Sequence, residues 1–403
     1  MRRISVLLIA VLVGLPACGG GSSSSSGAVR TILVDFNYDQ FATSYLGFFP
    51  TVAAVHPGDT IDFKQAWTGE PHTVTMGTLA NGLGKFMGPF VKKVRPVPAE
   101  EDPSLDAEFE AAYKGLPEFF GEGDGGDESL TPSASRPCYL PSGDVPTDKP
   151  CPTTEQPAFN GRQVFYNSGF IAYQGNNGNH FKVDLAKDTP AGEYFYFCLI
   201  HGPLMGGFLD VKPVSADTPS QGELNRQARK DLDAVTARMR KLDKAASSGK
   251  DRPAGVDVVE GGNGYEDGGI PPFLVDEFYP STVKTTVGKK VTWRISGHTV
   301  SFKVPKYGPQ IIVRADRSIE FNKQAYEAQG GPGYPKASAP SDESSGEPKP
   351  VAVDAGEYDG SKFLSSGLPD GAMDYSITFS KPGTYKYACL IHPAMIGTVV
   401  VSK

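Results

Sequence analysis

This chain of 403 residues contains little histidine and cysteine, with six residues of the first type and five of the second. It also lacks an excess of positive charge, because 46 acidic residues outnumber 39 basic ones and give a net charge of −7. A net negative surface argues against nucleic acids and anionic membrane surfaces as partners. No phosphate-binding loop, dinucleotide-binding motif or nucleophile triad occurs in a context that would give it meaning. The few histidines and cysteines can therefore be considered one by one.

The N-terminus has the pattern of an export signal. Two arginines precede an apolar run at 4–15, which is too short to span a bilayer as a permanent helix, so 1–17 is expected to be a signal peptide. The sequence ending at Cys18 resembles a bacterial lipobox, which implies that Cys18 is lipidated, and 18–28 then forms a Gly/Ser tether. Loss of both arginines leaves 37 basic against 46 acidic residues, a net charge of −9. We expect an exported protein, lipid-anchored at the extracytoplasmic face of the cell membrane, in the periplasm or at the cell surface.

The two halves of the chain carry the same four residue types in the same order. The sets are His72, Cys198, His201 and Met205 in the first half and His298, Cys389, His392 and Met395 in the second half. A thiolate and two imidazoles with a weak thioether ligand suit a redox-active copper ion. Zinc also binds Cys and His, but the methionine argues for copper. A domain that had kept its fold but lost its metal would usually lack the Cys or a His, and neither half does.

The repeat extends well beyond these loops. Residues 49–63 align with 279–293, and 191–198 align with 382–389, with further matches at 165–169 with 363–367 and at 181–185 with 375–379. Short runs of β-branched and aromatic residues with period-two alternation, broken by Gly and Pro, are typical of sandwich strands. We therefore predict an all-β protein with two Greek-key β-sandwich domains at 29–214 and 271–403, joined by a helical and Gly-rich linker at 215–270.

The linker begins with a charged, proline-free segment at 221–246 whose apolar residues recur at helical spacing, which predicts an amphipathic helix packed on a neighbouring domain. A Gly- and Asp-rich stretch follows at 247–269. Each half also has a long insertion, at about 79–161 and about 306–360. A short helix is expected at 103–114, with Asp102 as its N-cap.

Both halves resemble the cupredoxin family, the plastocyanin/azurin type of blue-copper domain. The Cys-x2-His-x2-Met loop of the second half is similar to that of amicyanin, and the loop of the first half is one residue longer. The resemblance implies that the eight residues above are the ligands of two type 1 copper ions. Thr73 and Thr299 stand where many family members have an Asn that helps to hydrogen-bond the cysteine sulfur, so the reduction potential cannot be carried over.

The remaining cysteines and histidines are few. Cys138 and Cys151 lie close together in a Pro-rich loop, and a disulfide between them is expected in an oxidising compartment, with two free thiols as the alternative. His56 and His180 have no counterpart in the other half, so surface or strand-end positions explain them.

The leading functional hypothesis is an electron-transfer protein rather than an enzyme, with transient redox proteins as partners. An exposed His201 and His392 would serve as electron ports, and each half is expected to fold and bind metal by itself. A copper-binding or delivery protein is the alternative. A copper oxidase or nitrite reductase-like enzyme is less favoured, because only two histidines remain for a second type of copper site.

Overall fold

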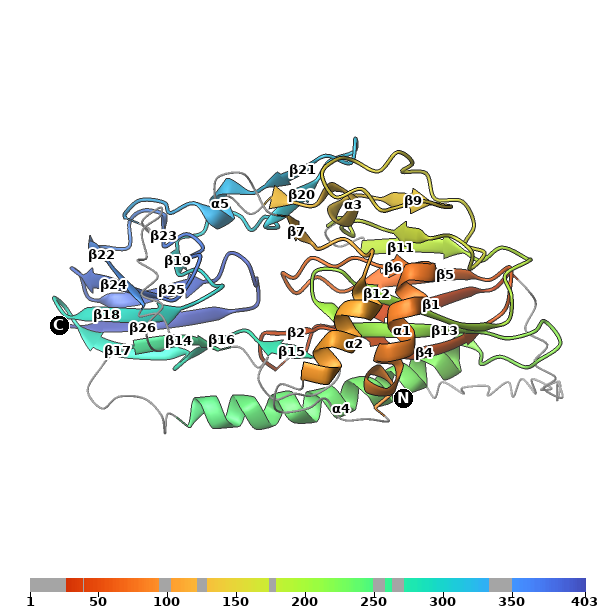
Figure 1. The fold of residues 1–403 in the computed structure, drawn as a ribbon. Coiled ribbons are helices and arrows are strands. Elements are labelled where there is room, and N and C mark those ends of the chain that lie inside the picture. The colour runs from red at the N-terminus through yellow and green to blue at the C-terminus, as the bar shows by residue number, and fades with distance from the viewer. Residues whose placement is uncertain are drawn as a thin grey trace, which may run out of the picture.

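The computed structural model describes residues 27–38, 40–93, 103–121, 129–173, 179–248, 258–262, 272–332 and 350–403. Two β-sandwiches lie side by side, with the first half of the chain at one end and the second half at the other, and a long helix runs along one side of both (Figure 1). The prediction of a mostly-β protein built from sandwiches is confirmed. Cys18 and the expected signal peptide lie outside the described residues.

The first sandwich consists of a four-stranded and a six-stranded sheet. The four-stranded sheet has the order β11(Asn179–Asp184), β5(Thr60–Gln65), β1(Val29–Val34) and β3(Phe48–Phe49). The six-stranded sheet has the order β4(Val52–Val55), β13(Gly202–Val211), β12(Gly192–Cys198), β6(Thr75–Met76), β10(Phe165–Asn167) and β9(Cys138–Leu140). β1 runs parallel to β5, and β4 runs parallel to β13. Alternating residues of both sheets, such as Ile32, Phe63 and Tyr196, meet in the buried core.

The second sandwich repeats this plan with two five-stranded sheets. The first sheet has the order β16(Glu277–Tyr279), β14(Val258–Gly262), β18(Lys290–Ile295), β24(Met373–Phe379) and β22(Val351–Tyr358). The second has the order β17(Thr282–Thr286), β26(Ile396–Ser402), β25(Gly383–Ala388), β19(Ser301–Phe302) and β23(Leu364–Ser365). The parallel pairs β14–β18 and β17–β26 correspond to β1–β5 and β4–β13 of the first half. Residues 258–262 were expected in the linker, so their pairing in this sheet corrects that part of the prediction.

The linker helix α4(Gln221–Ser247) confirms the amphipathic pattern. It begins with a capping box, in which the Ser220 hydroxyl accepts a hydrogen bond from the Glu223 backbone N–H and the Glu223 carboxylate accepts one from the Ser220 backbone. Its apolar stripe is buried at residues Leu224, Ala228, Leu232, Val235 and Met239. Leu224 joins the core of the first sandwich, and the other four residues pack with aromatic side chains from both halves, including Tyr45 and Phe273, so the helix contacts both sandwiches.

The insertions form small elements around the sandwiches. In the first half these are α1(Thr78–Val91), α2(Pro103–Tyr113), α3(Pro132–Ser135), β7(Phe120–Gly121) and β8(Ser129–Leu130). In the second half they are the hairpin β20(Ile311–Val313)–β21(Ile319–Phe321) and α5(Lys323–Tyr326). The expected helix at 103–114 is therefore confirmed as α2, whereas its expected cap at Asp102 lies outside the described residues. Ile311 of the second half joins a core cluster of the first half, so this hairpin contributes to the contact between the halves.

A direct strand pair also joins the two halves. β2(Thr43–Tyr45) of the first half pairs antiparallel with β15(Phe273–Val275) of the second half. Next to this pair, the Asp276 carboxylate accepts a hydrogen bond from the Ser44 hydroxyl at 2.9 Å, and the Glu277 carboxylate accepts one from the Ala42 N–H at 2.7 Å. The halves thus share a structured interface. Among the described residues, no helix has the length and apolar character needed to cross a membrane.

Candidate metal centres

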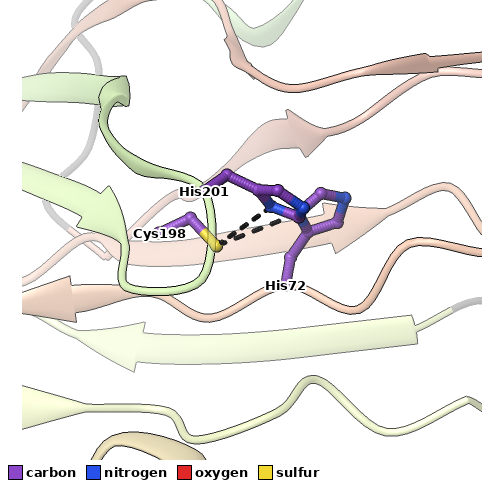
Figure 2. A group of neighbouring side chains, drawn as sticks. All are labelled: His72, Cys198 and His201. Atoms are coloured by element: carbon purple, nitrogen blue, oxygen red, sulfur yellow. Dashed lines mark hydrogen bonds between the residues drawn. The ribbon is translucent and has the colours of Figure 1, made fainter. Parts of the chain in front are cut away.

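The first centre forms where β12 ends. Cys198 is the last residue of β12, His201 lies in the turn before β13, and His72 lies between β5 and β6. The Nδ1 atoms of His72 and His201 are 3.1 Å apart, and the Cys198 Sγ lies 3.9 Å from the first and 3.5 Å from the second. Figure 2 shows both rings directed toward the sulfur. Three soft or borderline donor atoms therefore converge on one point.

The second centre has the same arrangement in the other sandwich. Cys389 follows β25, His392 lies in the next turn, and His298 lies between β18 and β19. The Nδ1 atoms of His298 and His392 are 3.1 Å apart, and the Cys389 Sγ is 4.0 Å from the His298 Nδ1. All donor atoms of each trio lie within 4.8 Å of one another. The structure thus brings together the three Cys and His residues of each set that the sequence singled out.

The spacing of these atoms fits a single metal ion. A first-row ion about 2.0 Å from nitrogen and about 2.3 Å from sulfur, in a trigonal plane, would hold its nitrogens about 3.5 Å apart and each nitrogen about 3.7 Å from the sulfur. The observed nitrogen–sulfur separations of 3.5 to 4.0 Å bracket the expected value, and the nitrogen–nitrogen separation of 3.1 Å in both centres is somewhat shorter than the expected one. Two imidazoles and one thiolate are also the in-plane donor set of a blue-copper site. The residues present therefore fit copper.

The two methionines lie in the same loops. Met205 and Met395 are fully buried, in the same core clusters as Cys198 and Cys389, respectively. The second loop is closed by backbone bonds, because the Met395 N–H donates to the His392 carbonyl at 3.0 Å and the Cys389 N–H donates to the Met395 carbonyl at 3.0 Å. This turn holds Met395 beside Cys389 and His392, so its thioether would be available as a weak further ligand of a copper ion.

A threonine supports each sulfur. The Thr73 N–H lies 3.4 Å from the Cys198 Sγ and its hydroxyl 3.8 Å, and the hydroxyl also accepts the Leu199 N–H at 2.8 Å. Thr299 does the same for Cys389, at 3.4 and 4.0 Å. These residues occupy the position at which the sequence departs from the family pattern. Each threonine therefore supplies a backbone N–H and a hydroxyl as donors to its sulfur, and in the second centre the Ile391 N–H is a further donor 3.3 Å from the Cys389 Sγ.

The surroundings of each cysteine favour an ionised thiol. Burial alone would raise the pKa of each cysteine, but the neighbouring imidazoles reverse this effect and hold the pKa of Cys198 and Cys389 well below the usual value. For His201 the effects have the opposite signs: burial alone would lower its pKa, but the Cys198 thiolate and Glu70 raise it to about 10. Because the thiolate is the form that binds metals, each site is electrostatically prepared for a cation.

Carboxylates contact the outer nitrogen of three of the histidines. Asp35 lies 3.0 Å from the His72 Nε2, and Glu70 lies 3.1 Å from the His201 Nε2 and 2.7 Å from the His392 Nε2. Burial would raise the pKa of Glu70, but both histidines hold it well below its usual value. A carboxylate on the outer nitrogen fixes the ring orientation and tautomer of a metal-binding histidine.

This arrangement corrects the prediction of exposed electron ports. The His392 side chain is 4% exposed and the His201 side chain 10%, because each ring edge is covered by Glu70. Each ligand set lies within one half of the chain, but Glu70 contacts both His201 of the first half and His392 of the second half. The surroundings of the metal centres are therefore shared between the halves, whereas the expectation that each half folds and binds metal by itself stays a prediction.

The two centres differ in one buried carboxylate. Asp276 lies 3.8 Å from the Nδ1 of His392, and burial raises the pKa of this carboxyl above its ordinary value. At the first centre Asp35 instead contacts the outer nitrogen of His72. The acidic residues Asp35, Glu70 and Asp276 were not identified from the sequence. The one signal was the Glu70-Pro71 pair immediately before His72, which the second half lacks.

The other predicted residues lie elsewhere. Cys138 and Cys151 form a disulfide, which confirms their pairing. His56 is fully buried rather than at the surface, and its Nε2 lies 2.9 Å from the Ala216 carbonyl. His180 pairs with Asp62 at 2.9 Å on the outer side of the first sandwich. Neither belongs to the donor clusters found in the described part of the chain.

Comparisons with known proteins give weak similarities. No family model matches the chain, and no curated protein matches it. Among solved structures, a Cu(I) form of an amicyanin mutant is 18% identical over 38% of this chain and 87% of its own, with a TM-score of 0.18. Amicyanin from Paracoccus versutus is 18% identical over 38% of this chain and 86% of its own, with a TM-score of 0.16. A purple cupredoxin from Nitrosopumilus maritimus is 19% identical over 36% of this chain and 98% of its own, with a TM-score of 0.18. With TM-scores this low, the cupredoxin-like character of each half rests on its own strands and donor residues.

Proposed function

We propose that this protein is an exported, lipid-anchored copper protein with two type 1 sites, which passes single electrons between redox partners. The observation that carries the proposal is the donor trio repeated in both halves, with Nδ1 atoms 3.1 Å apart in each. His72, Cys198, His201 and Met205 would hold one ion, and the corresponding residues His298, Cys389, His392 and Met395 would hold the other. Bound copper would supply a one-electron change between Cu(I) and Cu(II).

The residues of the chain support this role by restricting movement. The buried threonines fix each sulfur, and the carboxylates on the outer nitrogens fix the rings. A ligand set that changes little between oxidation states keeps the reorganisation small, which favours rapid electron transfer. The deep burial of both trios also excludes water from the ligand atoms. Lipid anchoring through Cys18 would place the protein where exported redox partners can reach it.

Copper delivery is the second candidate function. A carrier that hands over its ion needs an accessible site, and the burial of both cysteines argues against ready exchange. A copper oxidase or nitrite reductase-like enzyme remains less favoured because of the shortage of further histidines.

The test is to load the purified protein with copper and follow two properties. An electron-transfer protein should be intensely coloured in the oxidised state, should bleach and recover reversibly with one electron per copper, and should keep its copper against a chelator for hours. Loss of copper to the chelator within seconds, with delivery to an acceptor protein, would favour the delivery function. Weak copper uptake without colour would refute the assignment of the sites to copper, and with it both the electron-transfer and the delivery function.

A further inference from the structure

The loop that leads to His72 is longer than its counterpart in the second half. Six residues, 66–71, separate β5 from His72, whereas only two residues, 296 and 297, separate β18 from His298. The four additional residues extend the loop toward the other sandwich. Since the rest of the strand pattern is repeated, this extension is a specific feature of the first half.

The extended loop docks on the turn that carries His392. Gly69 lies against it so closely that a Cβ would be 2.3 Å from the Ile391 carbonyl oxygen. The Gln310 amide donates to the Gly69 carbonyl at 3.1 Å, and the Trp67 indole donates to the Tyr307 hydroxyl at 2.7 Å. Side chains of the second half thus hold the loop at two points just before Glu70.

Glu70 lies between the two centres as a result. Its Oε2 is 3.1 Å from the His201 Nε2 and its Oε1 is 2.7 Å from the His392 Nε2, and the carboxylate is 14% exposed. The Nδ1 atoms of both rings lie on the cysteine side, and a metal ion bound to each Nδ1 would leave the ring proton on each Nε2. Each Glu70 oxygen would then accept a hydrogen bond from a different centre.

We propose that Glu70 is a positioning residue shared by both copper centres, which makes the properties of each centre depend on the state of the other. This inference rests on the proposed function. The His201 and His392 rings share the single negative charge of Glu70. A ring that binds the more positive Cu(II) ion becomes the stronger hydrogen-bond donor and draws the carboxylate toward itself. The carboxylate then stabilises the oxidised state of the second centre less. Oxidation of one centre should consequently raise the reduction potential of the other.

The first test replaces Glu70 by Gln, which keeps the volume but can accept a hydrogen bond at only one end. Loss of the shared charge should weaken Cu(II) binding relative to Cu(I) binding at both centres by about tenfold, the lower end of the affinity change expected for such a contact, which corresponds to about 59 mV for one electron. The matched control is Asp35→Asn, since His72 is the one candidate ligand that Asp35 contacts at hydrogen-bond distance, its other partners being the Phe36 and Tyr45 N–H groups and the Thr68 hydroxyl, so this variant should shift the first centre alone. A Glu70→Gln effect confined to one centre, or absent from both, would overturn the proposal.

The second test measures the dependence itself by a double-mutant cycle. Cys389→Ser removes the thiolate of the second centre, and the potential of the first centre should then fall relative to the wild type poised with an oxidised second centre. In the Glu70→Gln background this difference should shrink by at least half. Equal differences in both backgrounds would show that Glu70 does not link the centres.

Failure of the proposed function has a separate signature. If the wild-type protein binds no copper with colour, the sites themselves are misassigned, whereas blue protein with two coppers whose potentials ignore Glu70 refutes only the shared role. A readout on the metal-free protein guards against misfolding. Slowly exchanging Nε2–H resonances of His201 and His392 should be present in the wild type, and Glu70→Ala should remove both while the resonance of His72, which contacts Asp35, and the amide spectrum are retained. Retention of both protected protons in that variant would also contradict the proposal.

Discussion

Replacement of Gly69 by Ala tests whether the close approach of the two halves depends on this residue. Gly69 has a φ of +120°, and an added Cβ would lie 2.3 Å from the Ile391 carbonyl oxygen and 2.9 Å from the His392 Cδ2. Backbone strain of about 1–3 kcal/mol and overpacking of about 1–3 kcal/mol would together cost about 2–6 kcal/mol. Because the opposing atoms are largely backbone, we expect the loop to move away from the second half.

The matched control is Gly297→Ala. Gly297 immediately precedes His298, has a φ of +70°, and has no atom within 4 Å of the Cβ position. This variant should therefore show only the strain of a left-handed conformation, about 1–2 kcal/mol. The two variants differ mainly in the clash with the neighbouring half.

Tryptophan fluorescence provides the assay, since Trp67 in the docked loop and Trp293 in the second core are the two tryptophans of the chain. With Trp293→Phe as a common background, the emission of native Gly69→Ala should shift to the red as Trp67 leaves Tyr307. The emission of Gly297→Ala should remain unchanged. Equal emission and equal denaturant midpoints for both variants would refute the account of the interface.

Three further predictions concern stability. Thr73→Val should lower the free energy of unfolding by about 1–3 kcal/mol, because the buried Leu199 N–H loses its acceptor; an unchanged denaturant midpoint would contradict this. Met239→Ala should cost about 2–5 kcal/mol by leaving a cavity under α4, while exposed Lys241→Ala should cost less than about 0.5 kcal/mol in the same titration. The pKa of Glu277 is raised by burial from 4.5 to about 7, so its contribution to stability is complete below pH 4.5 and is lost as the pH rises through 7. Glu277→Gln should make the thermal unfolding midpoint depend less on pH between 4.5 and 7. A midpoint that depends on pH as in the wild type would contradict this prediction.

Much of the candidate site follows from the sequence because the repeat supplies an internal comparison. Each donor appears twice with nearly the same spacing, and the strand pattern around it is repeated, so the trios could be assigned before their geometry was known. The helix α4 was predictable for a different reason: its apolar stripe and its Ser220–Glu223 cap are local signals.

The parts that could not be predicted depend on contacts between distant segments. Glu70 has no counterpart in the second half, and its position beside His392 follows from the docking of the two sandwiches. The helix α1 contains several glycines and Pro89, which oppose helix formation, yet Gly84 packs so closely on Phe195 that tertiary contact outweighs propensity. Strand β14 is hidden in a Gly-rich stretch, and its pairing with β18 compensates for weak local preference.

The most direct measurement of the central claim is the copper content and thiolate-to-copper absorption of three purified, copper-loaded proteins: wild type, Cys198→Ser and Cys389→Ser. The account predicts two tightly bound coppers per wild-type chain, and one fewer type 1 centre in each variant, with the colour of the other centre retained at a shifted potential. One copper in the wild type would show that one half does not bind the ion. Loss of both colours from a single substitution, in protein that is still folded, would contradict the assignment of one complete ligand set to each half.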